Sequence, residues 1–139
     1  MGDETRNVEI LKAAYQRWSD SKGKSADDWL RICAENIAFG SLAQGAPQGA
    51  AYLTAYSNRD ALWDYFMGLA RDWDMVEASM DHYVAQGDRV VAIGSCTWRY
   101  KKTGKVVSTP KADSWRFSDG KAVEFFEFYD TAQVHAAVG

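Results

Sequence analysis

The residues best placed for chemistry lie in the stretch KADSWRFS, residues 111–118. Its composition is typical of a β-strand, in which successive side chains point to opposite faces. Asp113 then shares a face with Trp115 and Phe117, and Lys111 stands on the same face. A carboxyl group in apolar surroundings has a raised pKa and can give or take a proton in a reaction. The alternative is that Asp113 is ionised and simply paired with Lys111.

His82 is a second candidate for acid–base chemistry, because an unperturbed imidazole has a pKa of about 6.5. It lies in MVEASMDHYVAQ, residues 75–86, where the alternation indicates another strand. On a regular strand His82 shares its face with four apolar residues, Val76, Ala78, Met80 and Val84. Together with Asp113 it forms the acid–base pair that the sequence offers. The alternative is a core histidine with satisfied ring nitrogens, whereas His135 falls in a C-terminal tail and is expected to be solvated.

A third acidic residue, Glu127, lies in the apolar stretch AVEFFEFYD, residues 122–130. The dipeptide Asp119-Gly120 predicts a hairpin turn before it. A two-residue turn places Ala112 opposite Glu127, so that Glu127 faces away from Asp113. A three-residue turn shifts this pairing, and the direction of Glu127 stays open.

These residues must be positioned by a helical first half and a strand-rich second half. Apolar spacing predicts a helix over residues 3–22, a second helix from an N-cap at Ser25 to about residue 34, and a short strand in ENIAFGSL. Residues 43–58, rich in Gly, Ala and Gln, predict a long connection of the kind that often forms a functional rim or lid. Asn58 is then expected to cap a helix over residues 59–73.

Three further strands follow the strand at residues 75–86, each joined to its predecessor by a glycine-containing turn. They cover residues 89–102, 106–117 and 122–130. Helices followed by hairpin-linked strands indicate an α+β domain, with the helices packed on one side of a bent antiparallel sheet. A chain of 139 residues without linkers or repeats is expected to be one domain, residues 1–139.

Composition excludes several classes of function. The net charge of −3 and the lack of a basic segment argue against nucleic acid as a partner. No apolar run is long enough to cross a membrane, and the polar start has no secretory signal, so we expect a cytoplasmic protein. Cys33 and Cys96 are then reduced core residues, and with only two histidines the sequence holds no metal-ligand signature.

The two stretches GDRVVAIGSCTWR and ADSWRFSDGKAVEFFEFYD, with the order of elements around them, resemble the nuclear-transport-factor-2-like (NTF2-like) superfamily. The last hairpin of that family commonly reads as an aspartate, an aromatic alternation, F-x-D-G-K and a closing aspartate. The resemblance is greatest to the SnoaL-like polyketide cyclases and the ketosteroid-isomerase-related branch. It implies a cone-shaped, strongly bent sheet that encloses an apolar pocket. It also implies a homodimer through the outer sheet face, and the apolar character of both faces of residues 122–129 agrees with this.

The resemblance also suggests roles for residues. Asp113 matches the aspartic acid with which ketosteroid isomerases stabilise an oxyanion, and which acts as a base in SnoaL-like cyclases. Tyr15 lies near the position of the isomerases' oxyanion tyrosine, but the interpretation that we favour is a core tyrosine with its hydroxyl at the edge. The isomerases' first-strand base is missing, because the matching stretch AFGSLAQG holds Gly40 and Ser41 and no carboxylate. True ketosteroid isomerisation is therefore not expected.

Limonene-epoxide-hydrolase-like members offer a further comparison. They use an arginine and an aspartate two residues apart on one strand, with a second aspartate, to activate water. Here Lys111 and Asp113 have that spacing, but lysine lacks the planar fork of arginine. Glu127 would also have to replace the second aspartate, so this match is weak.

Two hypotheses follow from the sequence. The first is an enzyme, of isomerase, cyclase or hydrolase type, that acts on an apolar carbonyl-bearing or ring-bearing metabolite without a metal or organic cofactor. Its acid–base residues would be Asp113, His82 and Tyr15, in a pocket lined by four aromatic residues, Trp18, Trp29, Trp115 and Phe126. The second is a non-catalytic domain of the same fold that binds a small molecule or dimerises.

Overall fold

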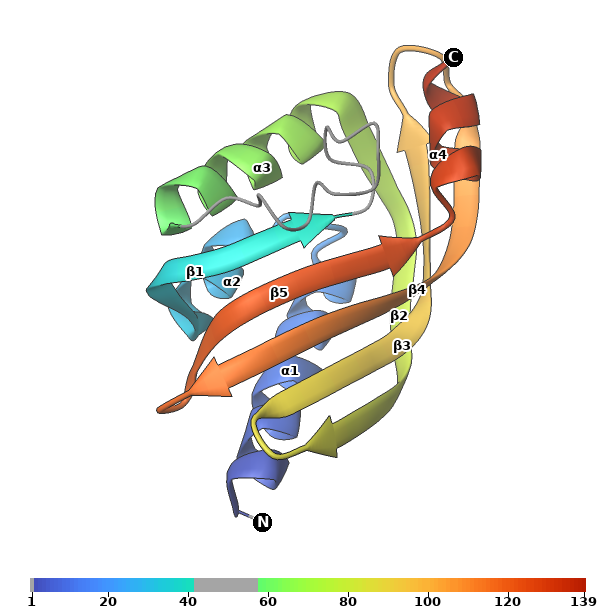
Figure 1. Cartoon of the computed structure of the whole chain (residues 1–139). Coiled ribbons are helices and arrows are strands. Elements are labelled where there is room, and N and C mark those ends of the chain that lie inside the picture. The colour runs from blue at the N-terminus through green and yellow to red at the C-terminus, as the bar shows by residue number, and fades with distance from the viewer. Residues whose placement is uncertain (1, 42–57) are drawn as a thin grey trace.

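The computed structural model describes residues 2–41 and 58–139. Helices dominate the first half and a long sheet the second, which confirms the predicted α+β class (Figure 1). The helices are α1 (Gly2–Asp20), α2 (Ala26–Ile32), α3 (Arg59–Asp72) and α4 (Thr131–Val138). The strands are β1 (Cys33–Ser41), β2 (Trp73–Gln86), β3 (Arg89–Tyr100), β4 (Val106–Ser118) and β5 (Lys121–Tyr129).

Local signals in the sequence mark the helix ends. The side chain of Asn58 accepts a hydrogen bond from the backbone N–H of Ala61 at 2.8 Å, and this caps α3 as predicted. The chain leaves α1 through Gly23, whose φ of 78° favours glycine. Asp130 caps α4 by accepting from the N–H of Gln133 at 3.1 Å. α4 is an unpredicted element, although an aspartate before an alanine-rich stretch is a helix-start signal.

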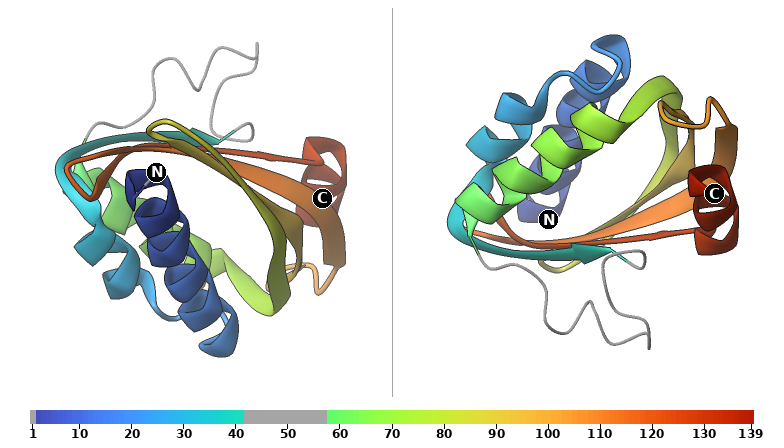
Figure 2. Two further views of the ribbon diagram at one scale, coloured as in Figure 1. Left: turned by 90° about the horizontal axis from the view of Figure 1, so that it is seen from below. Right: turned by 90° about the horizontal axis from the view of Figure 1, so that it is seen from above.

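The sheet has the strand order β1-β5-β4-β3-β2. Strands β2 to β5 form the predicted antiparallel meander, while β1 adds to the edge of the sheet parallel to β5. The sheet is strongly curved, and α1, α2 and α3 pack against its concave side (Figure 2). Leu11, Ile37 and Val90 have no exposed surface and form the centre of this core.

Strand β2 contains two β-bulges, at Val76 and at Asp81, and the second reverses the alternation of the side chains that follow it. Met80 pairs with Gly94, but His82 pairs with Ile93, so that Asp81 is an extra residue on β2. Gly94 is required there, because a Cβ atom at this position would lie 2.0 Å from the backbone oxygen of Ser79.

A further β-bulge lies in β5. The turn at Asp119-Gly120 is tight, with Ser118 paired to Lys121, but Val123 is then an extra residue between the pairs Phe117–Ala122 and Arg116–Glu124. All later pairs between β4 and β5 are therefore shifted by one residue relative to a regular two-residue hairpin.

Two sequence-based expectations concern the chain as a whole. None of the helices in the described ranges is long and apolar enough to span a membrane. The stretch predicted to form a rim or lid, residues 43–58, lies outside the described residues except for Asn58.

Candidate functional site

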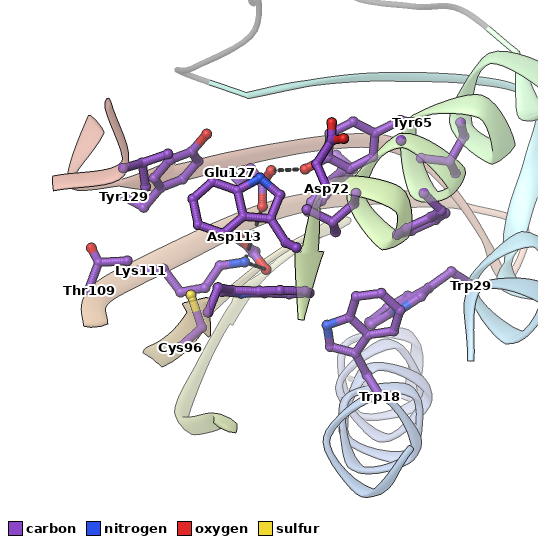
Figure 3. Close-up of a pocket in the computed structure, with 18 of the residues that line it drawn as sticks. Trp18, Trp29, Tyr65, Asp72, Cys96, Thr109, Lys111, Asp113, Glu127 and Tyr129 are labelled. Carbon is purple, nitrogen blue, oxygen red and sulfur yellow. Dashed lines mark hydrogen bonds and ion pairs between the residues drawn. The ribbon is translucent and has the colours of Figure 1, made fainter. Parts of the chain in front are cut away.

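A cavity of about 500 Å³ lies between the helices and the concave face of the sheet (Figure 3). Its wall is rich in aromatic side chains and includes five of the six tryptophans of the chain: Trp18, Trp29, Trp73, Trp98 and Trp115. Three of these are the tryptophans that we expect to contact a ligand. The rings of Trp29 and Trp115 stack with their centroids 5.4 Å apart, so this end of the wall is tightly packed.

Asp113 lies on β4 at the floor of this cavity, and its relative exposure is only 2%. The hydroxyl of Tyr15, on α1, donates a hydrogen bond of 2.5 Å to Oδ2 of Asp113. Nε1 of Trp115 in turn donates to the Tyr15 hydroxyl oxygen at 2.9 Å, which fixes the hydroxyl. The other carboxylate oxygen, Oδ1, is buried and has no hydrogen-bond partner among the described residues. A buried acceptor without a partner is unfavourable and therefore marks a site of interest.

Lys111 links Asp113 to a second buried carboxylate. Its Nζ lies 3.3 Å from Oδ2 of Asp113 and 3.1 Å from Oε2 of Glu127. The hydroxyl of Tyr65, on α3, donates to Oε1 of Glu127 at 2.5 Å. The cavity thus contains one connected network of two carboxylates, two phenols and one ammonium group (Figure 3).

Burial is the main influence on Asp113. It disfavours the charged carboxylate and raises the pKa of Asp113 to about 6, although Lys111 opposes this. The negative charge of Glu127 raises the pKa further, and the hydrogen bond from Tyr15 lowers it. Asp113 is therefore mostly ionised at pH 7, yet it is a stronger base than an ordinary aspartate.

The groups around Asp113 keep their protons. Burial, followed by the charge of Asp113, raises the pKa of Tyr15 well above its ordinary value. Burial and the charge of Glu127 do the same for Tyr65. Burial alone would lower the pKa of Lys111, but the charges of Asp113 and Glu127 outweigh it and raise that pKa. Lys111 is thus a permanent cation and the two phenols are permanent donors.

His82 does not take part in this site. It is exposed, and its neighbours Met80 and Tyr83 are the ones that pack against the core. The bulge at Asp81 is the reason, because it turns His82 to the outer face of the sheet. The pair of His82 and Asp113 expected from regular alternation is therefore not formed. His135 is exposed, but on α4 and not in a tail.

The bulge at Val123 changes which residues of β5 face the cavity. It pairs Glu127 directly with Asp113, so both carboxylates lie on the same face. Phe125 and Tyr129 line the cavity with Glu127, whereas Phe126 lies on the opposite face against Phe128, with ring centroids 4.8 Å apart. The expectation that Phe126 lines the pocket is wrong, and Phe125 takes that place. Only knowledge of the bulge would have assigned the two faces of β5 correctly.

The described residues contain no group of three His, Cys, Asp or Glu side chains that could hold a metal ion. The network described above can transfer protons through its carboxylates and can stabilise a negative charge through Lys111.

Comparison with known proteins identifies the family of the chain. A family model for the SnoaL-like domain matches residues 11–125. The chain belongs to the SnoaL-like domain family. A comparison of this SnoaL-like protein with curated proteins finds no match.

Solved structures agree with this assignment and confirm the predicted superfamily. An NTF2-like protein from Burkholderia thailandensis is 26% identical, with a TM-score of 0.75 over 96% of this chain and 97% of that chain. A provisionally assigned isomerase from Bacillus subtilis is 18% identical, with a TM-score of 0.79 over 100% and 96%. A provisionally assigned SnoaL-like polyketide cyclase from Jannaschia sp. is 19% identical, with a TM-score of 0.76 over 99% and 94%. The last two likenesses show the fold alone.

Proposed function

We propose that this SnoaL-like protein is an enzyme that removes a proton from an apolar small molecule bearing a carbonyl group or a ring. One observation carries the proposal. Asp113 is almost fully buried in the cavity, and one of its oxygens is held by Tyr15 and Lys111 while the other has no partner in the described structure. Oδ1 is closed off in this structure, so a neighbouring side chain must move slightly before a bound molecule can reach it. Once reached, this oxygen has a free acceptor position for a proton.

The proposed step is general-base catalysis. Oδ1 of Asp113 takes a proton from a carbon next to the carbonyl group, and the electron pair of that C–H bond moves towards the carbonyl oxygen. The Lys111 ammonium has three N–H groups, of which two meet Asp113 and Glu127, so the third can donate to the enolate oxygen. The proton on Asp113 can then return to another carbon, or the enolate can attack a second carbonyl group to close a ring.

The location of the base supports a reaction that differs from ketosteroid isomerisation. The described part of β1 contributes Cys33 but no carboxylate to the cavity. Four carboxylates line its described wall, and Asp64 and Asp72 of these lie on α3 with more exposed side chains. Asp113 is thus the buried carboxylate with a free oxygen, and we assign the role of base to it.

Deuterium exchange tests the proposal without knowledge of the natural substrate. In D₂O, 2-tetralone and similar bicyclic ketones lose α-protons, and proton NMR measures the rate. We expect the protein to accelerate exchange and Asp113→Asn to lower the rate by about 100-fold or more. Asp119→Asn, the same chemical change in the exposed β4–β5 turn, is the control. Ketones that bind but exchange equally fast with wild type and Asp113→Asn would overturn the proposal.

The geometry of Glu127 favours a second candidate, hydrolysis by an activated water. Lys111 contacts both Asp113 and Glu127, so the three residues can act together as in the limonene-epoxide-hydrolase-like arrangement. One carboxylate would take a proton from water and the other would give a proton to the leaving oxygen. Diol formation from styrene oxide tests this, and Glu127→Gln should abolish it. Absence of diol above the buffer rate removes the candidate.

The alternative to an enzyme is a non-catalytic domain that binds a small molecule. It predicts that Asp113→Asn leaves ligand affinity unchanged while neither form of the protein has any activity. Loss of turnover with retained affinity in Asp113→Asn instead supports the enzyme.

We also propose that the protein is a homodimer that joins through the outer face of the sheet. Adjacent residues across that face are apolar, since Ile93 pairs with Ala112 and Ala112 with Phe128. Ile93 and Phe128 are 40% and 46% exposed, which is unusual for side chains on a sheet face that meets only water. A second copy of the same surface would cover them.

Both cysteines, Cys33 and Cys96, are buried and free. Free thiols support the cytoplasmic location that we propose, because disulfides persist mainly in oxidising compartments. Fractionation of cells that make the protein would test this.

A further inference from the structure

The charges of the cavity do not balance. The buried network holds the carboxylates of Asp113 and Glu127 but only the one ammonium group of Lys111. Lys111 is also the only cationic side chain in the described wall of the cavity. Once Asp113 is ionised, the network carries one excess negative charge in surroundings where charges interact strongly.

Two further carboxylates in the described wall of the cavity add to this negative character. Asp64 and Asp72 on α3 both border the cavity. Arg71 pairs with Asp72 at 3.0 Å and largely offsets its charge, but no ion pair within the described ranges involves Asp64. An anionic ligand would therefore be repelled both by Asp64, in the more exposed part of the wall, and by the buried network.

The described hydrogen bonds of the network lead to the same conclusion. Tyr15 and Tyr65 both use their hydroxyl groups to donate to carboxylates. The polar atom left over in this network is an acceptor, Oδ1 of Asp113, and it is buried. A positive charge or a donor in the ligand would improve the environment of this oxygen, whereas another acceptor would not.

The aromatic wall favours a cation of a particular kind. Five tryptophans line the cavity, and the faces of indole rings attract cations, most strongly when water is excluded. Aromatic side chains together with a carboxylate recognise alkylated ammonium groups, because the methyl and methylene groups contact the rings while the charge is attracted to both.

We propose that the ligand of this cavity carries an alkylated, positively charged nitrogen, held between the tryptophans and the carboxylates of Asp113 and Glu127. The inference uses the site of the proposed function and names the substrate class as an amine-bearing carbonyl compound. A cationic nitrogen near the reacting carbon also makes its C–H bond more acidic. The proton goes to Oδ1 of Asp113, and the remaining electron pair is stabilised by the carbonyl group and by the positive nitrogen.

A matched pair of probes separates charge from shape. Benzyltrimethylammonium and neopentylbenzene have the same shape, but one has a positive nitrogen where the other has carbon. Tryptophan fluorescence at pH 7.5 measures both affinities on the wild-type protein. We expect the ammonium probe to bind about tenfold more tightly or better. Equal or tighter binding of the hydrocarbon, or no binding of the ammonium probe, would overturn the proposal.

Two variants locate the effect. Glu127→Gln removes the excess charge and should reduce the preference for the ammonium probe to near unity. Glu124→Gln removes the same charge from β5 outside the cavity, where Glu124 pairs with Arg116 at 2.8 Å, and should leave the preference unchanged. Equal preference in both variants and the wild type would place the cation elsewhere and contradict the assignment.

The result is independent of the exchange experiment. Deuterium exchange of 2-tetralone does not require an amine in the substrate. If the protein accelerates this exchange but does not prefer the ammonium probe, only the proposed substrate class is wrong. Ammonium preference without exchange in any ketone would leave the ligand class in place and remove the proposed proton abstraction.

Discussion

Replacing Asp113 by asparagine should make the protein more stable at neutral pH, and the gain should depend on pH. The carboxyl has a pKa of 3.8 in a model compound and about 6 in the folded protein, a difference of about two units. In the unfolded chain it loses its proton near pH 4, whereas the folded protein keeps that proton until about pH 6. Between these values the folded state binds more protons, so wild-type stability falls as the pH rises.

The size of this effect follows from the pKa difference. Each unit corresponds to about 1.4 kcal/mol, so Asp113 costs the wild type about 3 kcal/mol of unfolding free energy above pH 7 relative to pH 3.5. The cost shrinks as the pH falls and is absent below about pH 3, where the carboxyl is protonated in both states. Asp113→Asn cannot ionise and does not have this cost, while its amide oxygen can still accept from Tyr15.

Urea denaturation of both proteins at intervals from pH 3.5 to pH 8 provides the measurement. The difference in unfolding free energy between variant and wild type cancels most other titrations. We expect this difference to move in favour of the variant by about 3 kcal/mol between pH 3.5 and pH 8. A difference that stays constant, or that moves in favour of the wild type, would refute the reasoning. It would mean that Lys111 and Tyr15 hold Asp113 ionised at an ordinary or lowered pKa.

Three further predictions test other parts of the structure. Lys111→Met removes the cation next to Asp113 and should raise the pKa of Asp113 by about three units. Opposite charges about 4 Å apart attract by about 4 kcal/mol at the effective dielectric constant of about 20 that also describes buried protein sites. Carbon NMR titration of the carboxyl measures this pKa. Gly94→Ala puts a Cβ atom 2.0 Å from the Ser79 oxygen and should destabilise the fold by about 3 kcal/mol in urea denaturation. Ile93→Glu should convert the proposed dimer to a monomer in light scattering at micromolar concentration.

Each of these has an outcome that contradicts it. A pKa of Asp113 that falls or stays the same in Lys111→Met would show that the ammonium group does not stabilise the carboxylate. A loss of less than 1 kcal/mol in Gly94→Ala would mean that the β2 bulge adapts without cost. A monomeric wild type, or an Ile93→Glu variant that remains dimeric, would exclude the outer sheet face as the interface.

The elements of the fold were predictable because each has a local cause. Apolar spacing determined α1 and α3, the Asn58 cap marked the start of α3, and the turn at Asp119-Gly120 defined the last hairpin. The burial of Asp113 among aromatic residues also follows from regular alternation within β4, which the structure retains between residues 107 and 117.

The rest of the site was not predictable from alternation, because two strands contain β-bulges. The extra residue at Asp81 turns His82 away from the cavity. The extra residue at Val123 turns Phe126 away from the cavity and Glu127 towards it. A bulge depends on how two strands pair across the sheet and leaves little trace in either strand alone. Gly94 was the clearest local sign, since a glycine inside a strand often marks a close approach of backbones.

The hydrogen bond between Tyr15 and Asp113 also has a consequence for the order of assembly. The two residues are 98 positions apart, so the donor leaves the ribosome long before its acceptor exists. If the sheet closed around Asp113 before α1 docked, the carboxylate would be buried without its phenol, which is costly. We therefore expect α1 to dock no later than the burial of Asp113, and pulsed hydrogen exchange should show protection of α1 no later than that of β4. A chain in which α1 is released would lose the hydrogen bond from Tyr15 to Asp113 while most of the sheet stayed folded.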